Sequence, residues 1–195
     1  MNNWQIVKLF EICEIISGGT PKTSIAEYWN GNIYWLSVKD FNTNSKYVYK
    51  SEKTITELGL KNSSTNILQE GDIIISARGT VGELAMIPYD MAFNQSCYGL
   101  RAKNIIENNF LYYLLKNNIN ILKKNTHGSV FDTITKNTFD DIEISLPPLE
   151  IQKKIAKVLG ALDDKIELNN KIIANLEEQT QSLYKNWFID FEFSF

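Results

Sequence analysis

The sequence predicts an α+β protein, with a mixed α/β domain over residues 1–147 followed by one long C-terminal helix. Short β-branched runs bounded by turn residues recur in the first part, which holds nine of the ten glycines. Residues 148–195 instead carry apolar side chains at alternating three- and four-residue spacings. Pro147-Pro148 separates the two parts, at a position where the start of a helix tolerates proline.

The elements of the first part follow from hydrophobic patterning. Gly71-Asp72 is a turn signal that precedes a run of isoleucines, and the strictly alternating run 141–146 is typical of a half-buried strand. A further segment has the three- and four-residue apolar spacing of a helix. The expected strands are 33–38, 73–77, 84–87 and 141–146, and the expected helix is 110–122.

The C-terminal part predicts a helix from about Glu150 to Asn186, roughly 55 Å long at ~1.5 Å per residue. Its apolar seam spans about five heptads and is interrupted by the polar residues Asn169 and Thr180. A rod of this kind cannot bury its stripe alone, so we expect it to pair with a helix from a second copy or a partner. The alternative is a helix folded back onto its own domain. The residues proposed for dimerisation are Ile155, Leu159, Leu162, Ile166, Asn169, Ile173, Leu176 and Leu183.

Composition excludes several classes of protein. The chain has 20 basic and 23 acidic residues, a net charge of −3, so any binding to nucleic acid must depend on a local patch or on partner subunits. No apolar run reaches the ~18 residues of a membrane helix, and no signal peptide is visible. Two cysteines without a CxxC spacing argue against a disulfide scaffold or a zinc site. We therefore expect a reduced cytoplasmic protein that binds neither metal nor membrane.

Catalytic motifs are also lacking. The loop 18–24 resembles a phosphate-binding loop, but a proline stands where a Walker A motif needs its lysine. The lone histidine, His127, has no partners arranged as a catalytic triad. The paired acids Asp163 and Asp164 are expected to be solvated. We therefore predict a chain that is not an enzyme and holds no cofactor of its own.

Polar loops are abundant instead, and they indicate a binding surface. Arg78 lies between glycines, where its guanidinium would reach a phosphate or a guanine edge, and the amides of Asn94 and Gln95 are of the type that pairs with adenine. For each loop the alternative is an ordinary turn bonded to its own backbone. The candidate DNA-facing residues are Thr20, Lys22, Thr23, Arg78, Asn94, Gln95, His127 and Ser129.

Several segments, in order, resemble one known family: the specificity (S) subunits of type I restriction–modification systems. The segments that resemble its target recognition domain are 16–23, 27–31, 71–82, 94–100 and 127–129. Residues 146–152 resemble the entry to the family's conserved spacer helix, with Ile151 where the family prefers glutamate, and 187–192 resemble its end. Family members usually carry two recognition domains and two spacer helices. The chain, with one of each, is therefore similar to a half-length subunit.

The resemblance implies a non-catalytic protein that reads double-stranded DNA for methyltransferase (M) subunits and, in a complete system, for restriction (R) subunits. S-adenosylmethionine and ATP would be held by those partners. Residues 1–147 would form the target recognition domain, and residues 148–195 the spacer helix used for dimerisation and for docking of M subunits. Two copies related by a two-fold axis would pair their helices antiparallel and read a split, inverted target for adenine methylation. The alternatives are a regulatory or antirestriction fragment that competes with full-length subunits, and a helical adaptor with no role on DNA.

Overall fold

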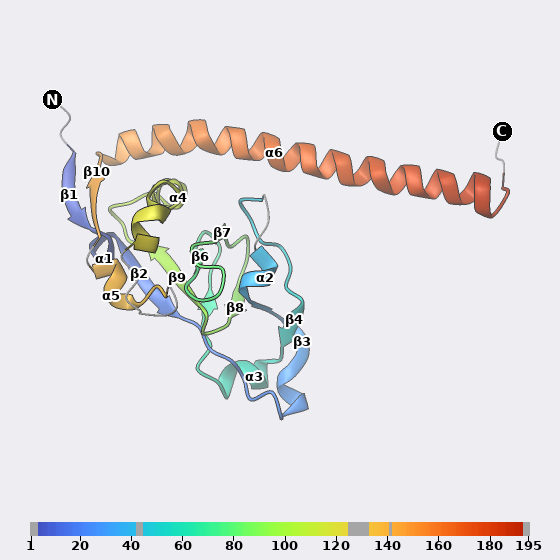
Figure 1. Cartoon of the computed structure of the whole chain (residues 1–195), viewed down its shortest axis with the longest axis horizontal. Helices are drawn as coiled ribbons and strands as arrows, with labels where there is room; N and C mark the ends of the chain where they lie inside the picture. The colour runs from blue at the N-terminus through green and yellow to red at the C-terminus, as the bar shows by residue number, and fades with distance from the viewer. Residues whose placement is uncertain (1–3, 42–44, 125–132, 141, 193–195) are drawn as a thin grey trace.

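The longest element of the protein is a single helix, α6 (Leu149–Tyr184), and the other elements form a mixed α/β body near one end of it (Figure 1). The computed structural model describes residues 4–41, 45–124, 133–140 and 142–192. Beyond Tyr184 the helix continues as a π-helical turn, Lys185–Ile189. The predicted fold class, α+β with a long C-terminal helix, is confirmed.

The central layer of the body is a four-stranded antiparallel sheet in the order β2-β9-β6-β7. Its strands are β2 (Cys13–Ser17), β9 (Cys97–Ala102), β6 (Ile73–Ser76) and β7 (Leu84–Met86). The register pairs Ile74 of β6 with Ala85 on one side and Gly99 on the other. β6 is therefore an inner strand, and its unbroken isoleucine run follows from burial on both faces of the sheet, since all four of its residues are buried.

A second four-stranded sheet has the order β4-β3-β8-β5. It contains β4 (Lys53–Ile55), β3 (Trp29–Leu36), β8 (Met91–Phe93) and β5 (Ile67–Leu68), with β3 and β8 parallel. A separate two-stranded ribbon pairs β1 (Gln5–Lys8) with β10 (Glu143–Leu146). The ribbon joins the start of the chain to the strand that leads directly into α6.

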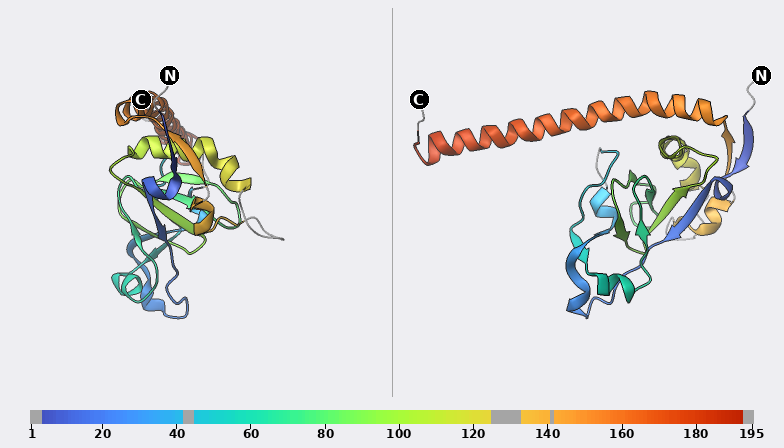
Figure 2. Two further views of the ribbon diagram at one scale, coloured as in Figure 1. Left: turned by 90° about the vertical axis from the view of Figure 1, so that its left-hand side faces the viewer. Right: turned by 180° about the vertical axis from the view of Figure 1, so that it is seen from behind.

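Short helices connect these strands, and one longer helix covers the central sheet. The short ones are α1 (Leu9–Ile12), a 3₁₀ turn (Ala26–Tyr28), α2 (Val38–Phe41), α3 (Glu57–Lys61) and α5 (Lys136–Asp140). The longer helix is α4 (Asn108–Lys124), which lies between the central sheet and α6 (Figure 2). Within the described residues no helix is both long and apolar enough to cross a membrane.

The three isoleucines of β6 organise the core because their side chains alternate between the two faces of the sheet. Ile73 and Ile75 pack with α4, whose Leu111 and Leu115 are almost fully buried. Ile74 packs on the opposite face with residues of the second sheet. Burial of this kind stabilises the fold by roughly 1.5–3 kcal/mol per large side chain. Both cysteines are buried free thiols, and burial raises the pKa of each to about 12.

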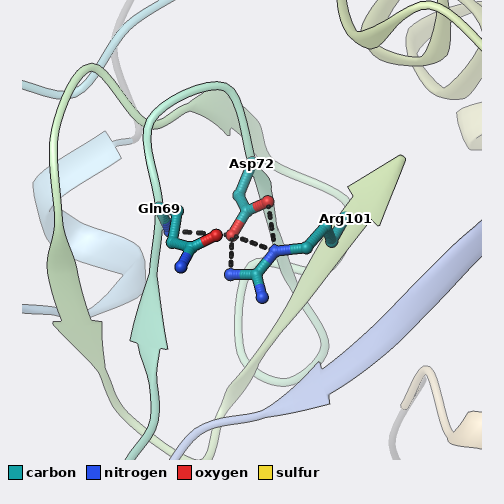
Figure 3. A network of polar contacts seen from close by, with 3 residues as sticks. All are labelled: Gln69, Asp72 and Arg101. Atoms are coloured by element: carbon teal, nitrogen blue, oxygen red, sulfur yellow. Dashed lines mark hydrogen bonds and ion pairs between the residues drawn. The ribbon is translucent and has the colours of Figure 1, made fainter. Parts of the chain in front are cut away.

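An ion pair between buried Asp72 and half-buried Arg101 fixes the turn that precedes β6 (Figure 3). The Asp72 carboxylate accepts hydrogen bonds from Arg101 Nε at 3.0 Å, from Arg101 Nη2 at 2.6 Å and from the backbone N–H of Gln69 at 2.8 Å. Gly71, just before it, has a φ of 86°, a conformation that favours glycine. The Gly-Asp turn signal of the sequence is therefore supported by a side-chain network across to β9.

Candidate nucleic-acid interface

Three polar loops leave the same end of the central sheet. β2 ends at Ser17, which pairs with Tyr98 near the start of β9, and β6 ends at Ser76, which pairs with Cys97. The loops after β2, after β6 and before β9 therefore lie next to one another. β2 points away from α6 (Figure 1), whereas the end of the loop after β6 lies nearer to the helix, since Gly82 and Glu83 line a pocket together with Asp163 of α6. We call the loops 18–24, 77–83 and 94–96 the loop surface.

The first loop is held against the third by close backbone contact. The Gly19 N–H donates to the Phe93 carbonyl at 3.0 Å. A Cβ on Gly18 would lie 2.1 Å from the Asn94 carbonyl oxygen, so glycine is needed there for steric reasons. The Thr20 hydroxyl donates to the side-chain oxygen of Gln95. Two of the candidate DNA-facing residues, far apart in the sequence, are thus brought into direct contact.

Two indole rings support the first loop from beneath. The Nε1 of Trp35, a buried residue of β3, donates to the Gly19 carbonyl at 2.9 Å, and the Nε1 of Trp29 donates to the Lys22 carbonyl at 3.3 Å. The two rings meet edge to face with centroids 5.1 Å apart. The side chains of Lys22 and Thr23 are exposed. The loop therefore has a fixed backbone and presents a free ammonium and a free hydroxyl.

The third loop separates the two neighbouring amides. Asn94 Oδ1 accepts the backbone N–H of Ser96 at 3.0 Å, so this half-buried side chain closes its own turn. Gln95 is exposed. Asn94 therefore fits the alternative of an ordinary turn bonded to its own backbone better than Gln95 does. Of the two amides, only that of Gln95 projects outward, with its side-chain oxygen accepting from Thr20.

The second loop carries an exposed guanidinium. Arg78 follows the end of β6, and the neighbouring Ala77 N–H donates to the Ser96 carbonyl at 2.8 Å, which links this loop to the third. The turn is closed by Ser76, whose Oγ accepts the Glu83 N–H at 2.8 Å, and by Gly79 at a φ of 78°. Arg78 therefore extends from a rigid turn. His127 and Ser129, the remaining candidates, lie outside the described residues.

The first five turns of α6 are anchored to the body mainly by polar contacts. Gln152 is buried, and its Nε2 donates to the carbonyls of Pro147 at 2.9 Å and Ile105 at 3.2 Å. Its Oε1 accepts the backbone N–H of Glu107 at 3.0 Å. Ala156, one turn further on, is buried against the body. One glutamine therefore ties the start of α6 to the segment that precedes α4.

A second anchor lies about three turns along the same face of α6. Tyr113 of α4 donates from its hydroxyl to Asp163 Oδ2 at 2.6 Å, and Ser45 bonds to Glu167. Lys46 is buried and donates from Nζ to Asn109 Oδ1 at 2.8 Å and to the Tyr113 hydroxyl at 3.4 Å. Burial lowers the pKa of Lys46, an effect that the carboxylates of Asp163, Asp164 and Glu107 oppose. Burial and the bond to Asp163 raise the pKa of Tyr113.

Asp163 therefore differs from the expectation that both acids of its pair are solvated. Its carboxylate is half-buried because Tyr113 and Lys46 lie beneath it, whereas Asp164 is exposed. Lys46, Tyr113 and Gln152 were not among the sequence candidates. Polar residues at helical spacing are typical of a solvated face, and nothing in their pattern marks a contact with another element.

A second face of α6, next to the face that is turned to the body, is apolar and exposed over most of its length. Of the seam residues, Leu162, Ile166, Ile173, Leu176 and Leu183 are between 47% and 59% exposed, and Asn169 is exposed with them. Ile155 and Leu159, at the start of the seam, are half-buried, and Ile155 packs against the main core. The folded-back alternative therefore applies to the inner face of the first five turns, while the apolar stripe is left open. Val158 and Ile172 belong to the same stripe and extend the sequence-derived seam.

The described residues offer no group of three or more histidine, cysteine, aspartate or glutamate side chains arranged to hold a metal ion. Two surfaces of the molecule are candidates for binding. One is a set of rigid polar loops, and the other is a long apolar stripe.

Comparison with known proteins gives one family. The family described as "Type I restriction modification DNA specificity domain" matches residues 1–178. The specificity subunit of the type I restriction enzyme MjaIX from Methanocaldococcus jannaschii is 37% identical over 194 residues, 97% of this chain and 45% of that protein. Across three specificity subunits of that organism, the chain covers 41–45% of the relative's length.

Solved structures share the fold. A chain in a structure of a type I R-M system is 25% identical with a TM-score of 0.67, covering 92% of this chain and 43% of that one. The S subunit of a type I restriction–modification system from M. genitalium has a TM-score of 0.72 at 15% identity, covering 98% and 47% respectively. With a family match over most of its length, the chain belongs to the type I restriction–modification DNA specificity family.

Proposed function

We propose that this chain supplies DNA sequence specificity to a type I restriction–modification enzyme and is itself non-catalytic. The observation that carries the proposal is the family match over residues 1–178 of a chain that presents polar loops at one end of its central sheet and a long apolar stripe on α6. The loop surface reads bases in the major groove, where each base pair presents a distinct pattern of donors and acceptors. The rod holds two such reading surfaces apart.

Within the loop surface, the exposed side chains are the candidates for base and phosphate contact. These are Lys22, Thr23, Arg78 and Gln95. Thr20 and Asn94 act mainly by shaping the loops, since their polar atoms are bonded within the surface. The chain as a whole has a net charge of −3, so it gains little from the phosphate backbone by itself. We expect weak, salt-sensitive binding by the chain alone and tight binding in complex with M subunits.

A second copy of the chain covers the apolar stripe in this proposal. The two polar seam positions specify how the helices align, because an antiparallel pair places them opposite each other in one register. With Asn169 opposite the partner's Thr180, the other seam residues between Leu162 and Trp187 meet apolar residues. The remaining pairs in this register are Ile166 with Leu183, Ile173 with Leu176, and Leu162 with Trp187. A shift of one heptad either way places Asn169 against Ile173 or Trp187.

This register predicts the geometry of the target. The midpoint of the segment anchored to the body is near residue 158, and the two midpoints are about 50 Å apart at ~1.5 Å per residue. At ~3.4 Å per base-pair step, this separation is about 15 base pairs, so each surface reads a half-site with a short unread gap between them. Two-fold symmetry makes the half-sites inverted copies.

The chemistry itself belongs to the partner subunits. M subunits, with S-adenosylmethionine, methylate an adenine that they rotate out of the duplex, since its amino group is otherwise unreachable. R subunits with ATP carry out restriction where they are present. The role of this chain is to fix which adenine is presented. The basic charge needed to hold DNA also comes from the partners.

The experiment that tests the function is co-expression of the chain with the M subunit of its own system, followed by sequencing of modified adenines. We expect one split, inverted motif with a single gap length. Methylation at a motif without inverted halves would contradict the homodimer. Absence of methylation, combined with inhibition of a full-length specificity subunit in the same cells, would support a competing regulatory fragment instead.

The register is tested separately by cysteine crosslinking, because both native thiols are buried. The double variant Asn169→Cys/Thr180→Cys should form an intermolecular disulfide under mild oxidation. The matched variant Asn169→Cys/Trp187→Cys reports the register shifted by one heptad and should remain reduced. The reverse result would refute the pairing of the two polar positions.

A further inference from the structure

Beside the apolar packing of Ile155 and Ala156, the body holds α6 through hydrogen bonds, which are directional. Hydrogen bonds depend on angle as well as distance, whereas apolar contacts allow two surfaces to slide. α6 is attached through Gln152 at one point and through Asp163 at another, about 17 Å further along at ~1.5 Å per residue. Two separated directional contacts fix the direction of a rod.

The second attachment, between Tyr113 and Asp163, is held in place by several neighbouring groups. The Tyr113 hydroxyl lies between Asp163, to which it donates at 2.6 Å, and Lys46 Nζ at 3.4 Å. Three aromatic rings surround that ammonium, with centroids 5.0–5.6 Å away, those of Tyr113, Tyr47 and Tyr112. Rings at this distance favour a cation electrostatically and limit its movement. The Lys46 backbone is also fixed, since its carbonyl accepts the Met86 N–H at 2.8 Å.

Because this attachment lies far from the free end of α6, a small displacement at the attachment moves that end by a larger distance. From Gln152, the first attachment, to Tyr184 the helix extends about 48 Å at ~1.5 Å per residue, and Glu167 also bonds to Ser45 of the body along the way. A tilt of about 4° about Gln152 moves the far end by about 3.4 Å, which is one base-pair step. The same tilt needs a displacement of only about 1.2 Å at Asp163 relative to Gln152. Replacing the direct bond to Tyr113 by a water-bridged contact gives a displacement of that size.

We propose that Lys46, Tyr113 and Asp163 are positioning residues that set the angle between the body and α6, and thereby the number of base pairs between the two halves of the target. The proposal rests on the proposed function, in which α6 holds two reading surfaces apart. In this proposal the number of base pairs between the half-sites depends both on the length of α6 and on its contact with the body. None of the three residues touches DNA in this arrangement.

The test compares Tyr113→Phe and Asp163→Ala with the unchanged chain, each co-expressed with the M subunit, by sequencing of modified adenines. Tyr98→Phe is the matched control, since Tyr98 lies on β9 and packs edge-on against Phe139. We expect the unchanged chain and the control to give one gap length. The two variants should methylate the same half-sites at two or more adjacent gap lengths. A single unchanged gap in both variants would overturn the proposal.

A second measurement needs no DNA. Spin labels at Lys61→Cys and Gln181→Cys, two exposed positions on the body and on the rod, report the distance between them in protein diluted with unlabelled copies. The distribution should broaden in Tyr113→Phe and Asp163→Ala and remain narrow in Tyr98→Phe. An equally narrow distribution in all chains would refute the positioning role. If the unchanged chain reads no split target, the proposed function fails, whereas this measurement still decides whether the contact sets the angle.

Discussion

The ion pair between Asp72 and Arg101 allows a prediction of stability in which the two partners are unequal. The side chain of Asp72 is only 5% exposed, whereas that of Arg101 is 32% exposed. If Asp72 is removed, the guanidinium can turn toward water. If Arg101 is removed, the carboxylate is left buried without its cation, retaining only the Gln69 N–H.

The magnitude follows from the bonds lost. Hydrogen bonds to charged groups contribute about 1.5–3 kcal/mol, and a buried charge without its partner costs more than an exposed one. We therefore expect Arg101→Ala to lower the free energy of unfolding by about 3 kcal/mol and Asp72→Asn by about 2 kcal/mol. The double variant should lose less than the sum of the two, since no buried charge remains unpaired.

Urea denaturation followed by circular dichroism measures the four chains of this cycle. Equal losses for the two single variants, or strict additivity in the double variant, would refute the reasoning. As a control for the loss of a surface cation, Lys103→Ala removes an exposed lysine whose Nζ donates only to the Phe10 carbonyl. It should change stability by less than about 1 kcal/mol.

Three further predictions concern the loop, the stripe and the thiols. Gly18→Ala should lower the free energy of unfolding by about 1–3 kcal/mol in the same denaturation assay, because its Cβ meets a backbone carbonyl at 2.1 Å. Ile166→Glu with Ile173→Glu should give a monomer in light scattering at unchanged helix content; an unchanged dimer would contradict the seam. Cys13 and Cys97, with pKa values raised to about 12, should not react with iodoacetamide at pH 8.5 in the folded protein and should react once it is unfolded in urea.

Much of the fold can be predicted from the sequence because the strongest sequence patterns are local. The isoleucine run after Gly71-Asp72 became β6, and the alternating run near 141–146 became β10. The heptad pattern predicted a helix from about Glu150 to Asn186. The regular part of α6, Leu149–Tyr184, begins and ends within two residues of those bounds. Strands β8 and β9 were not predicted, since Met91–Phe93 is short and Cys97–Ala102 includes a glycine and an arginine. Their pairing depends on partners far away in the chain.

The candidate site was predictable where polar residues sit in turns, and less so where they form contacts between distant elements. Turn chemistry identified the loops that contain Thr20, Arg78 and Gln95, but their convergence follows from the order β2-β9-β6, which the sequence does not display. The sequence pattern does not indicate that the indole N–H groups of Trp29 and Trp35 hold the first loop. A turn can be predicted from neighbouring residues in the sequence, whereas the distant residue that a side chain contacts cannot.

On α6, the sequence predicted the apolar stripe but not the polar contacts with the body. An apolar residue on a solvent-facing helix stands out, since its exposure is costly and calls for a partner. A polar residue on the same helix is compatible with water and so carries no sign of a contact. Yet Gln152 and Asp163 decide where the apolar stripe points, because they fix which face is turned toward the body. In the proposed homodimer, a mutation on the polar face would therefore change how the two copies meet without touching their interface.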